Sequence, residues 1–199
     1  MKTQRGISMI EVVVTIAIMG ILMAAAMPSV GDWIRNSRVR NTAESIQNGL
    51  QQARMEAVRL NRPVTFSLVS NLTSGCTLSS SSGSWVVSQE APTSHCHDTP
   101  STTTSPMVVA KGAVADGGGA TVSATNAADA AATSITFNGF GQIANASTAT
   151  AIRRIAVTSA DGTYPLQVEV SLGGIGRMCD TRVLANSGDT RACNNSVTN

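Results

Sequence analysis

Charged and aromatic side chains are scarce in this sequence. Only 13% of its 199 residues are charged and 3% are aromatic, while Ser, Thr, Gly and Ala make up much of the remainder. Such a composition favours strands and loops over a helical bundle. The formal net charge is only +2, so the overall charge gives no argument for binding to nucleic acid or to an anionic surface.

The residue sets that catalysis or phosphate binding requires are also missing from the sequence. Both histidines, His95 and His97, fall in one Ser- and Thr-rich stretch, and no serine lies in a nucleophile-elbow motif. The glycines at 117–119 predict a flexible turn and not a phosphate-binding loop. No second Cys/His cluster accompanies residues 95–98, so we expect no metal site there. We therefore expect a non-enzymatic protein without a cofactor.

Basic side chains are absent from the long apolar segment at residues 7–30. The segment is long enough to cross a bilayer, which needs about 20 helical residues. It contains one acidic residue, Glu11, and a carboxylate at the bilayer centre costs roughly 3 kcal/mol on insertion scales. Because no Lys, Arg or His within the segment can neutralise Glu11, its partner must be a free amine or must come from another copy of the chain.

A secretory signal peptide is an alternative interpretation of the N-terminus. Lys2 and Arg5 precede the apolar segment, and the alanines at 24–26 resemble a cleavage site. However, the segment is too long for the apolar region of a signal peptide, it contains Glu11, and the helical pattern continues past it. Basic residues flank it on both sides and leave the orientation open. The four cysteines indicate an oxidising compartment, so we expect the C-terminal part to lie outside the cytoplasm.

Residues 33–60 carry the pattern of an amphipathic helix. One apolar stripe follows alternating spacings of four and three: Val39, Ala43, Ile46, Leu50, Ala53, Ala57 and Leu60. Its alanines imply close approach to a flat partner such as a sheet, with a coiled-coil seam as the alternative. Asn61 and Pro63 predict the end of the helix, whereas Pro28 predicts a bend. We therefore expect one long, kinked helix over residues 7–60.

After Pro63 the pattern changes to short β segments separated by turn residues. We predict strands at 64–69, 85–88, 107–110, 135–138, 154–158 and 166–172, with a weaker candidate at 121–124. The segments 70–84, 90–106 and 116–120 are rich in Ser, Thr or Gly and predict loops. The polar tail at 180–199 is expected to be loose unless it is tied down.

Four cysteines permit three sets of disulfide pairings. We predict that Cys76 pairs with Cys96, which closes the Ser-rich loop around Trp85. We predict that Cys179 pairs with Cys193, which pins the polar tail. Each bridge would stabilise the fold by about 3 kcal/mol in the loop-entropy model.

Residues 6–11, Gly-Ile-Ser-Met-Ile-Glu, resemble the leader junction of type IV pilins and type II secretion pseudopilins. A short basic leader ends at Gly6, apolar Ile7 follows the cut, and Glu11 takes the fifth mature position. Pro28 falls where pilins carry a helix-kinking proline. The resemblance implies that a prepilin peptidase cuts after Gly6 and methylates the amine of Ile7. It also implies that Glu11 pairs with the N-terminal amine of a neighbouring subunit in a filament.

Residues 53–64, 135–142 and 176–180 resemble segments of the GspH/FimT branch of minor pilins and minor pseudopilins. The resemblance implies an α+β, pilin-like fold, in which a long kinked helix packs on an antiparallel β-sheet head. Its parts would be a leader at 1–6, a transmembrane and assembly helix at 7–30, an amphipathic second half at 31–62 and a periplasmic head at 63–199. The protein would be anchored in the inner membrane and would join other major and minor pilins in a type IV pilus or a type II secretion pseudopilus.

Some FimT-like proteins bind DNA through a Gly-Arg-x-Arg loop near the C-terminus. Here only Arg177 fits, because the second arginine falls on Cys179 when Gly176 is aligned. Arg182 and Arg191 would contribute to phosphate contact if the tail folds back. A DNA-binding minor pilin in natural transformation is therefore an alternative function, and a solvated charged loop is the simpler interpretation. A single-pass membrane protein with a ligand-binding head is a further alternative.

Overall fold

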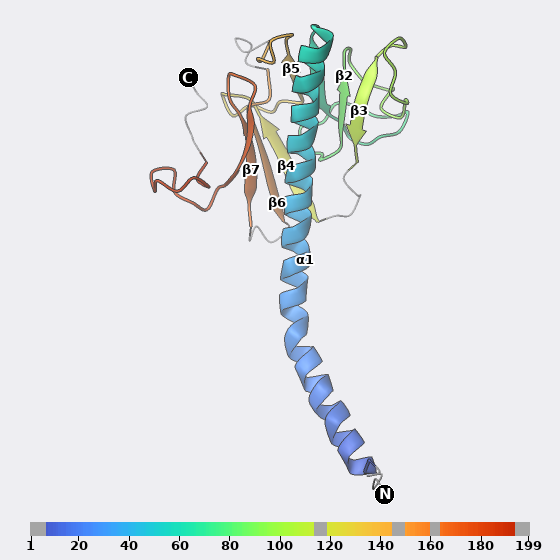
Figure 1. Ribbon diagram of the computed structural model, residues 1–199, viewed down its shortest axis with the longest axis vertical. Coiled ribbons are helices and arrows are strands. Elements are labelled where there is room, and N and C mark those ends of the chain that lie inside the picture. The colour runs from blue at the N-terminus through green and yellow to red at the C-terminus, as the bar shows by residue number, and fades with distance from the viewer. Residues whose placement is uncertain (1–6, 114–118, 145–149, 160–163, 194–199) are drawn as a thin grey trace, which may run out of the picture. The chain divides into compact units, whose positions relative to one another are not determined.

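The structure is a computed structural model that describes residues 7–113, 119–144, 150–159 and 164–193, with only the helical backbone at 25–29. The chain divides into two compact units, Met1–Arg35 and Asn36–Asn199. One helix, α1 (Met9–Leu60), contributes to both units, whereas all strands of the described residues belong to the second unit (Figure 1).

In the first unit, α1 begins just after Ser8, whose carbonyl accepts hydrogen bonds from the backbone of Glu11 and Val12. Its large apolar side chains are exposed, from Met9 at 86% to Met23 at 60%, and Ile7 just before it is 77% exposed. No helix among the described residues combines the length and the apolar character that crossing a bilayer requires. The membrane span expected at 7–30 stays a prediction. The bend expected at Pro28 also stays a prediction, because it falls where side chains are not described.

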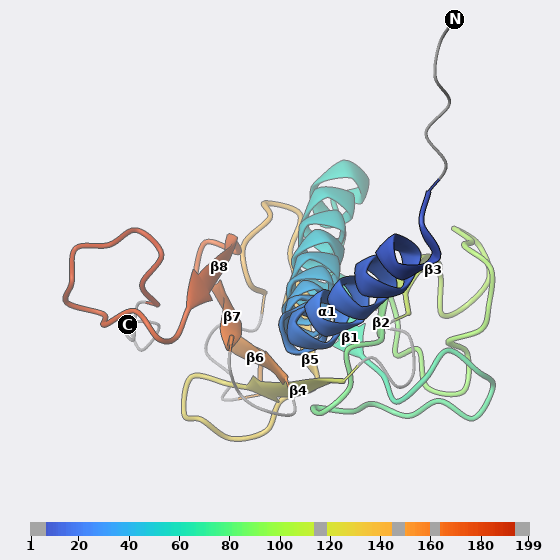
Figure 2. The same ribbon diagram turned by 90° about the horizontal axis from the view of Figure 1, so that it is seen from below.

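The second unit contains two antiparallel sheets of four strands each. The first sheet has the order β3-β2-β1-β5 and the second the order β4-β6-β7-β8. The first comprises β1 (Val64–Leu68), β2 (Trp85–Ser88), β3 (Val108–Gly112) and β5 (Ser134–Phe137). The second comprises β4 (Ala120–Thr125), β6 (Arg154–Ser159), β7 (Leu166–Val170) and β8 (Gly176–Asp180). The edge strands β3 and β8 lie on opposite sides of α1 (Figure 2).

The core of the second unit lies between the C-terminal half of α1 and the sheets. The predicted apolar stripe is buried, and only its last residue, Leu60, is partly exposed. Its alanines permit the close approach to a sheet that the sequence predicts. At Gly49 the helix backbone comes so near the rings of Phe66 and Trp85 that an added Cβ would lie 2.8 Å from each. Trp85 also donates from Nε1 to the Ser45 hydroxyl of α1 at 3.0 Å.

The helix ends as its sequence predicts. Asn61 adopts a left-handed conformation with φ of 49°, which asparagine tolerates better than most side chains. The amide of Arg62 donates to the Ala57 carbonyl at 3.2 Å, and the amide of Asn61 donates to the Val58 carbonyl at 3.3 Å. These two bonds form a Schellman motif, which satisfies carbonyls that the end of a helix leaves free.

Seven of the eight strands in the described residues were predicted, with ends that differ by no more than two residues. Met107 was expected to start β3, but its φ of 54° is incompatible with a strand, so β3 begins at Val108. β7 stops at Val170 because a turn follows. In this turn the Gly174 amide donates to the Ser171 carbonyl, and Gly174 itself has a φ of 76°. β8 was not predicted as a strand. The predicted loop at 116–120 falls mostly outside the described residues.

Candidate functional site

Glu11 is the only charged side chain among described residues 7–31, and it stands among exposed apolar side chains. It lies in the first turn of α1, where the helix dipole favours a carboxylate. No ion-pair partner for Glu11 occurs within the described part of the chain. The candidate assembly site therefore holds an exposed Ile7 and a carboxylate that needs a counter-charge once water is removed. Gly6, on the other side of the predicted cut, lies outside the described residues.

Arg177, the first predicted DNA contact, is tied into the outer face of the second sheet. It lies opposite Glu169 on the neighbouring strand, and its Nη2 is 3.1 Å from the Glu169 carboxylate, whose residue is only 4% exposed. The same guanidinium donates to the carbonyls of Thr190 and Ala192. Arg177 thereby anchors the C-terminal loop to β8.

The other two predicted DNA contacts, Arg182 and Arg191, also have carboxylate partners. Arg182 pairs with Asp180 at 2.6 Å and stacks over the Tyr164 ring, with its central carbon 4.4 Å from the ring centroid. Arg191 pairs with Asp189 at 2.7 Å. Hydrogen bonds from the Arg191 side chain and backbone lower the pKa of Asp189 from 3.8 to about 2. The tail folds back onto β8, but each of the three arginines is paired with an acid.

Both predicted disulfides are confirmed. Cys76 is bonded to Cys96 and Cys179 to Cys193, and the structure contains no free cysteine. Cys76 and Cys96 are fully buried in a small second core. The bond from Cys193 to β8, together with the hydrogen bond from Arg177 to Ala192, ties the tail to the second sheet.

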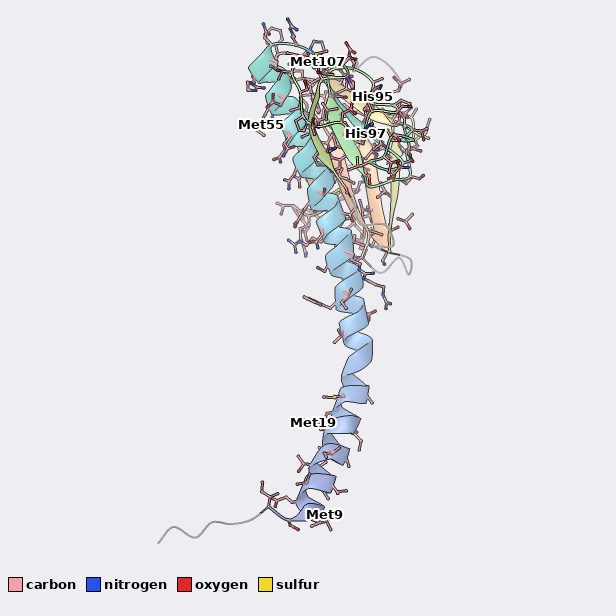
Figure 3. The ribbon with its side chains drawn as sticks, turned by 90° about the vertical axis from the view of Figure 1, so that its right-hand side faces the viewer. Met9, Met19, Met55, His95, His97 and Met107 are labelled. Atoms are coloured by element: carbon pink, nitrogen blue, oxygen red, sulfur yellow. A yellow bond between two sulfur atoms is a disulfide. The ribbon has the colours of Figure 1, made fainter. Side chains whose placement is uncertain are left out.

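Among the described residues, one group of potential metal ligands lies close together: Glu169, Cys179 and Cys193. The two sulfurs of this cluster form a disulfide, so neither is a thiolate that could ligate zinc. His95 and His97 instead both contact the Asp98 carboxylate, at 3.0 Å and 3.3 Å. Figure 3 shows these two histidines among the loops of the head.

Two family matches cover separate parts of the sequence. Residues 42–174, more than half of the chain, match the family described as type II transport protein GspH. The chain belongs to the GspH family. Residues 1–27 of this GspH-family chain match a prokaryotic N-terminal methylation motif, a range that includes Gly6, Ile7 and Glu11. The resemblance predicted from the sequence is confirmed.

Two solved structures are similar to this GspH-family chain, both of the type IV minor pilin FimU from Pseudomonas aeruginosa (strain PAO1). They are 17% and 16% identical to it, with TM-scores of 0.43 and 0.44. The aligned regions cover 71% and 73% of this chain and 90% of each FimU chain. A search of curated proteins finds no match.

The α+β class, with one long helix on antiparallel sheets, agrees with the prediction. The family is one of structural, non-enzymatic proteins, and the methylation motif implies processing by a prepilin peptidase and assembly with other pilins. The predicted roles of Gly6, Ile7, Glu11 and Pro28, and DNA contact by the three arginines, stay predictions.

Proposed function

We propose that this chain is a minor pilin or pseudopilin that assembles through its N-terminal helix. It would enter, and prime or cap, a type IV pilus or a type II secretion pseudopilus. The observation that carries the proposal is the presence in one chain of a methylation motif at 1–27 and a GspH match at 42–174. The isolated carboxylate of Glu11 among exposed apolar side chains gives the proposal its mechanism.

Removal of residues 1–6 takes away the charges of Lys2 and Arg5 and turns the backbone nitrogen of Ile7 into a charged amine. The new amine belongs to Ile7, and Glu11 follows it by four residues. When apolar helices of several subunits pack together, each isolated charge would lose its hydration at a cost of several kcal/mol. An amine from one subunit against Glu11 of its neighbour offsets both costs, because opposite charges attract more strongly at low dielectric. The pairing thus favours a particular stagger between subunits.

The location follows from the same chemistry. Residues 7–30 would hold the protein in the inner membrane before assembly, with a prepilin peptidase acting at Gly6. The head would lie in the periplasm, where an oxidising environment permits the Cys76–Cys96 and Cys179–Cys193 bonds. Other major and minor pilins or pseudopilins would be its partners.

Intact-mass and N-terminal analysis of the full chain extracted from membranes tests this proposal. We expect the mature protein to begin at a methylated Ile7, and a Gly6→Val control, with a bulky residue before the cut, to keep Met1. A wild-type protein that begins at Met1 would contradict the proposal and would favour a plain single-pass membrane protein.

A further inference from the structure

Exposed apolar side chains gather around the C-terminal end of α1. Met55, Val58 and Ile175 are 62%, 52% and 59% exposed, and Phe140 on a neighbouring turn is 83% exposed. The first three line one groove of about 480 Å³ together with Gln51, Arg54, Arg59, Gly174 and Gly176. We name this the α1–β8 groove. Figure 3 shows Met55 on the side of α1 that faces away from the strands.

The α1–β8 groove is held in shape by hydrogen bonds from α1 to the turn at Gly141 and to the first residue of β8, Gly176. Arg54 donates from Nε to the Gly141 carbonyl at 2.9 Å, and Gln47 donates from Nε2 to the Gly176 carbonyl at 3.2 Å. The turn at Gly141 also touches the turn before β8, since a Cβ on Gly174 would lie 2.3 Å from the Gly141 oxygen. A preformed groove loses little conformational entropy when it binds a ligand.

The rim of the α1–β8 groove is basic. Arg54 and Arg59 line the groove, Arg62 follows just beyond the end of α1, and Glu56 is the one acid between residues 54 and 62. Glu56 is already paired with Arg59 at 2.7 Å. Within the described residues, neither Arg54 nor Arg62 has a carboxylate partner. An occupant with apolar side chains would complement Met55, Val58 and Ile175, and a carboxylate on it would complement the arginines.

We propose that the α1–β8 groove binds an acidic amphipathic segment of a different subunit in the same filament. Its apolar side chains would cover Met55, Val58 and Ile175, and its carboxylate would meet Arg54 or Arg62. A second copy of this chain offers few carboxylates for this role. All acids of the described head except Glu90 and Asp98 are already paired with arginines, and Glu11 of the helix is assigned to the Ile7 amine under the proposed function. The inference rests on the proposed function, which supplies the filament.

Photo-crosslinking in intact cells tests this inference on the full chain. A benzoylphenylalanine replaces Met55, and a matched control replaces Leu184, which is 79% exposed on the C-terminal loop. Mass spectrometry then identifies the linked peptide. From Met55 we expect a peptide of another protein that itself begins with a methylated residue, with Asp or Glu within about one helical turn of the linked position. From Leu184 we expect no such product.

Charge reversal at the rim tests the chemistry of the occupant. Arg62→Glu should lower the crosslinking yield about tenfold, as expected for like charges brought together, and changing the partner's carboxylate to Lys should restore it. Arg40→Glu, on an exposed arginine elsewhere on α1, is the control and should leave the yield unchanged. A second copy of this chain as the product, a lipid, a peptide without an acid, or a yield unaffected by Arg62→Glu would overturn the inference.

The N-terminus of the same samples separates the two proposals. A methylated Ile7 together with no crosslink from Met55 above the Leu184 control would contradict the groove inference alone. An intact Met1 would contradict the proposed function itself.

Discussion

Arg177 and Glu169 lie opposite each other on β8 and β7, with the guanidinium Nη2 3.1 Å from the carboxylate Oε2. Glu169 is buried and also accepts a hydrogen bond from Gln167. The same guanidinium donates to two carbonyls of the C-terminal loop. Arg177 therefore connects the second sheet to this loop, beside the Cys179–Cys193 bond. Arg177, which resembles a DNA contact in sequence, therefore has a structural role in the head.

Replacing Arg177 should destabilise the head. Arg177→Ala removes the main counter-charge of a buried carboxylate, so we expect the free energy of unfolding to fall by about 1–3 kcal/mol. Arg191→Ala is the matched control, because its pair with Asp189 is exposed and should contribute less than about 0.5 kcal/mol. Denaturant unfolding of the full chain in detergent measures both, and equal losses would contradict the structural role of Arg177.

Paired arginines should make this protein a poor DNA binder. Arg177, Arg182 and Arg191 each face a carboxylate, which cancels most of the charge that phosphates would meet. We expect the full chain in detergent not to retard DNA even at low salt, where counterion release favours binding most. Retardation that is lost in the Arg182→Ala, Arg191→Ala double variant would contradict this expectation and would support the DNA-uptake alternative.

Gly49 should resist substitution although it lies within a helix. Alanine normally stabilises a helix by about 1 kcal/mol relative to glycine. At this position its Cβ would lie 2.8 Å from both aromatic rings, so overpacking should outweigh the gain and destabilise the head by about 1–3 kcal/mol. Gly75→Ala, where nothing lies within 4 Å, is the control and should be neutral. A Gly49→Ala variant with a raised melting temperature would show that the helix does not approach the sheet so closely.

The sequence predicted those features whose cause is local. The stripe from Val39 to Leu60 follows helical periodicity, and the helix end follows from Asn61 and Pro63, so both were predicted correctly. β8 was missed because its short alternation starts at a glycine and places Arg177 and Cys179 on the outer face. The Arg177–Glu169 pair depends on the pairing of β7 with β8, which was not predicted. The α1–β8 groove depends on contacts between segments far apart in the sequence, which no local pattern encodes.

The C-terminal loop should loosen only in strong acid. The pKa of Asp189 is lowered to about 2 by hydrogen bonds from Arg191, so the ionised form is the one that the fold favours. The stabilisation is therefore complete above the ordinary pKa of 3.8 and is lost as the pH falls through about 2. Hydrogen exchange of the Arg191 amide, which donates to Asp189, should rise over this range in the wild type. In the Asp189→Asn variant, the exchange rate of the Arg191 amide should change with pH only as the intrinsic exchange rate does. A transition near pH 4 in the wild type would contradict the pairing of Asp189 with Arg191.

The most direct test of the central claim is the amount of Glu11→Ala protein that enters the filament. The fraction in sheared filaments, relative to the membrane fraction, is measured for the full chain, and N-terminal analysis confirms that Ile7 is still exposed by cleavage. Glu44→Ala is the control, because Glu44 is an exposed acid on the same helix, paired with Arg40. If the amine of Ile7 and the carboxylate of Glu11 stabilise subunit contacts, Glu11→Ala should lower filament entry to about a tenth or less, while Glu44→Ala leaves it unchanged. Equal entry of Glu11→Ala and wild-type protein would contradict the account.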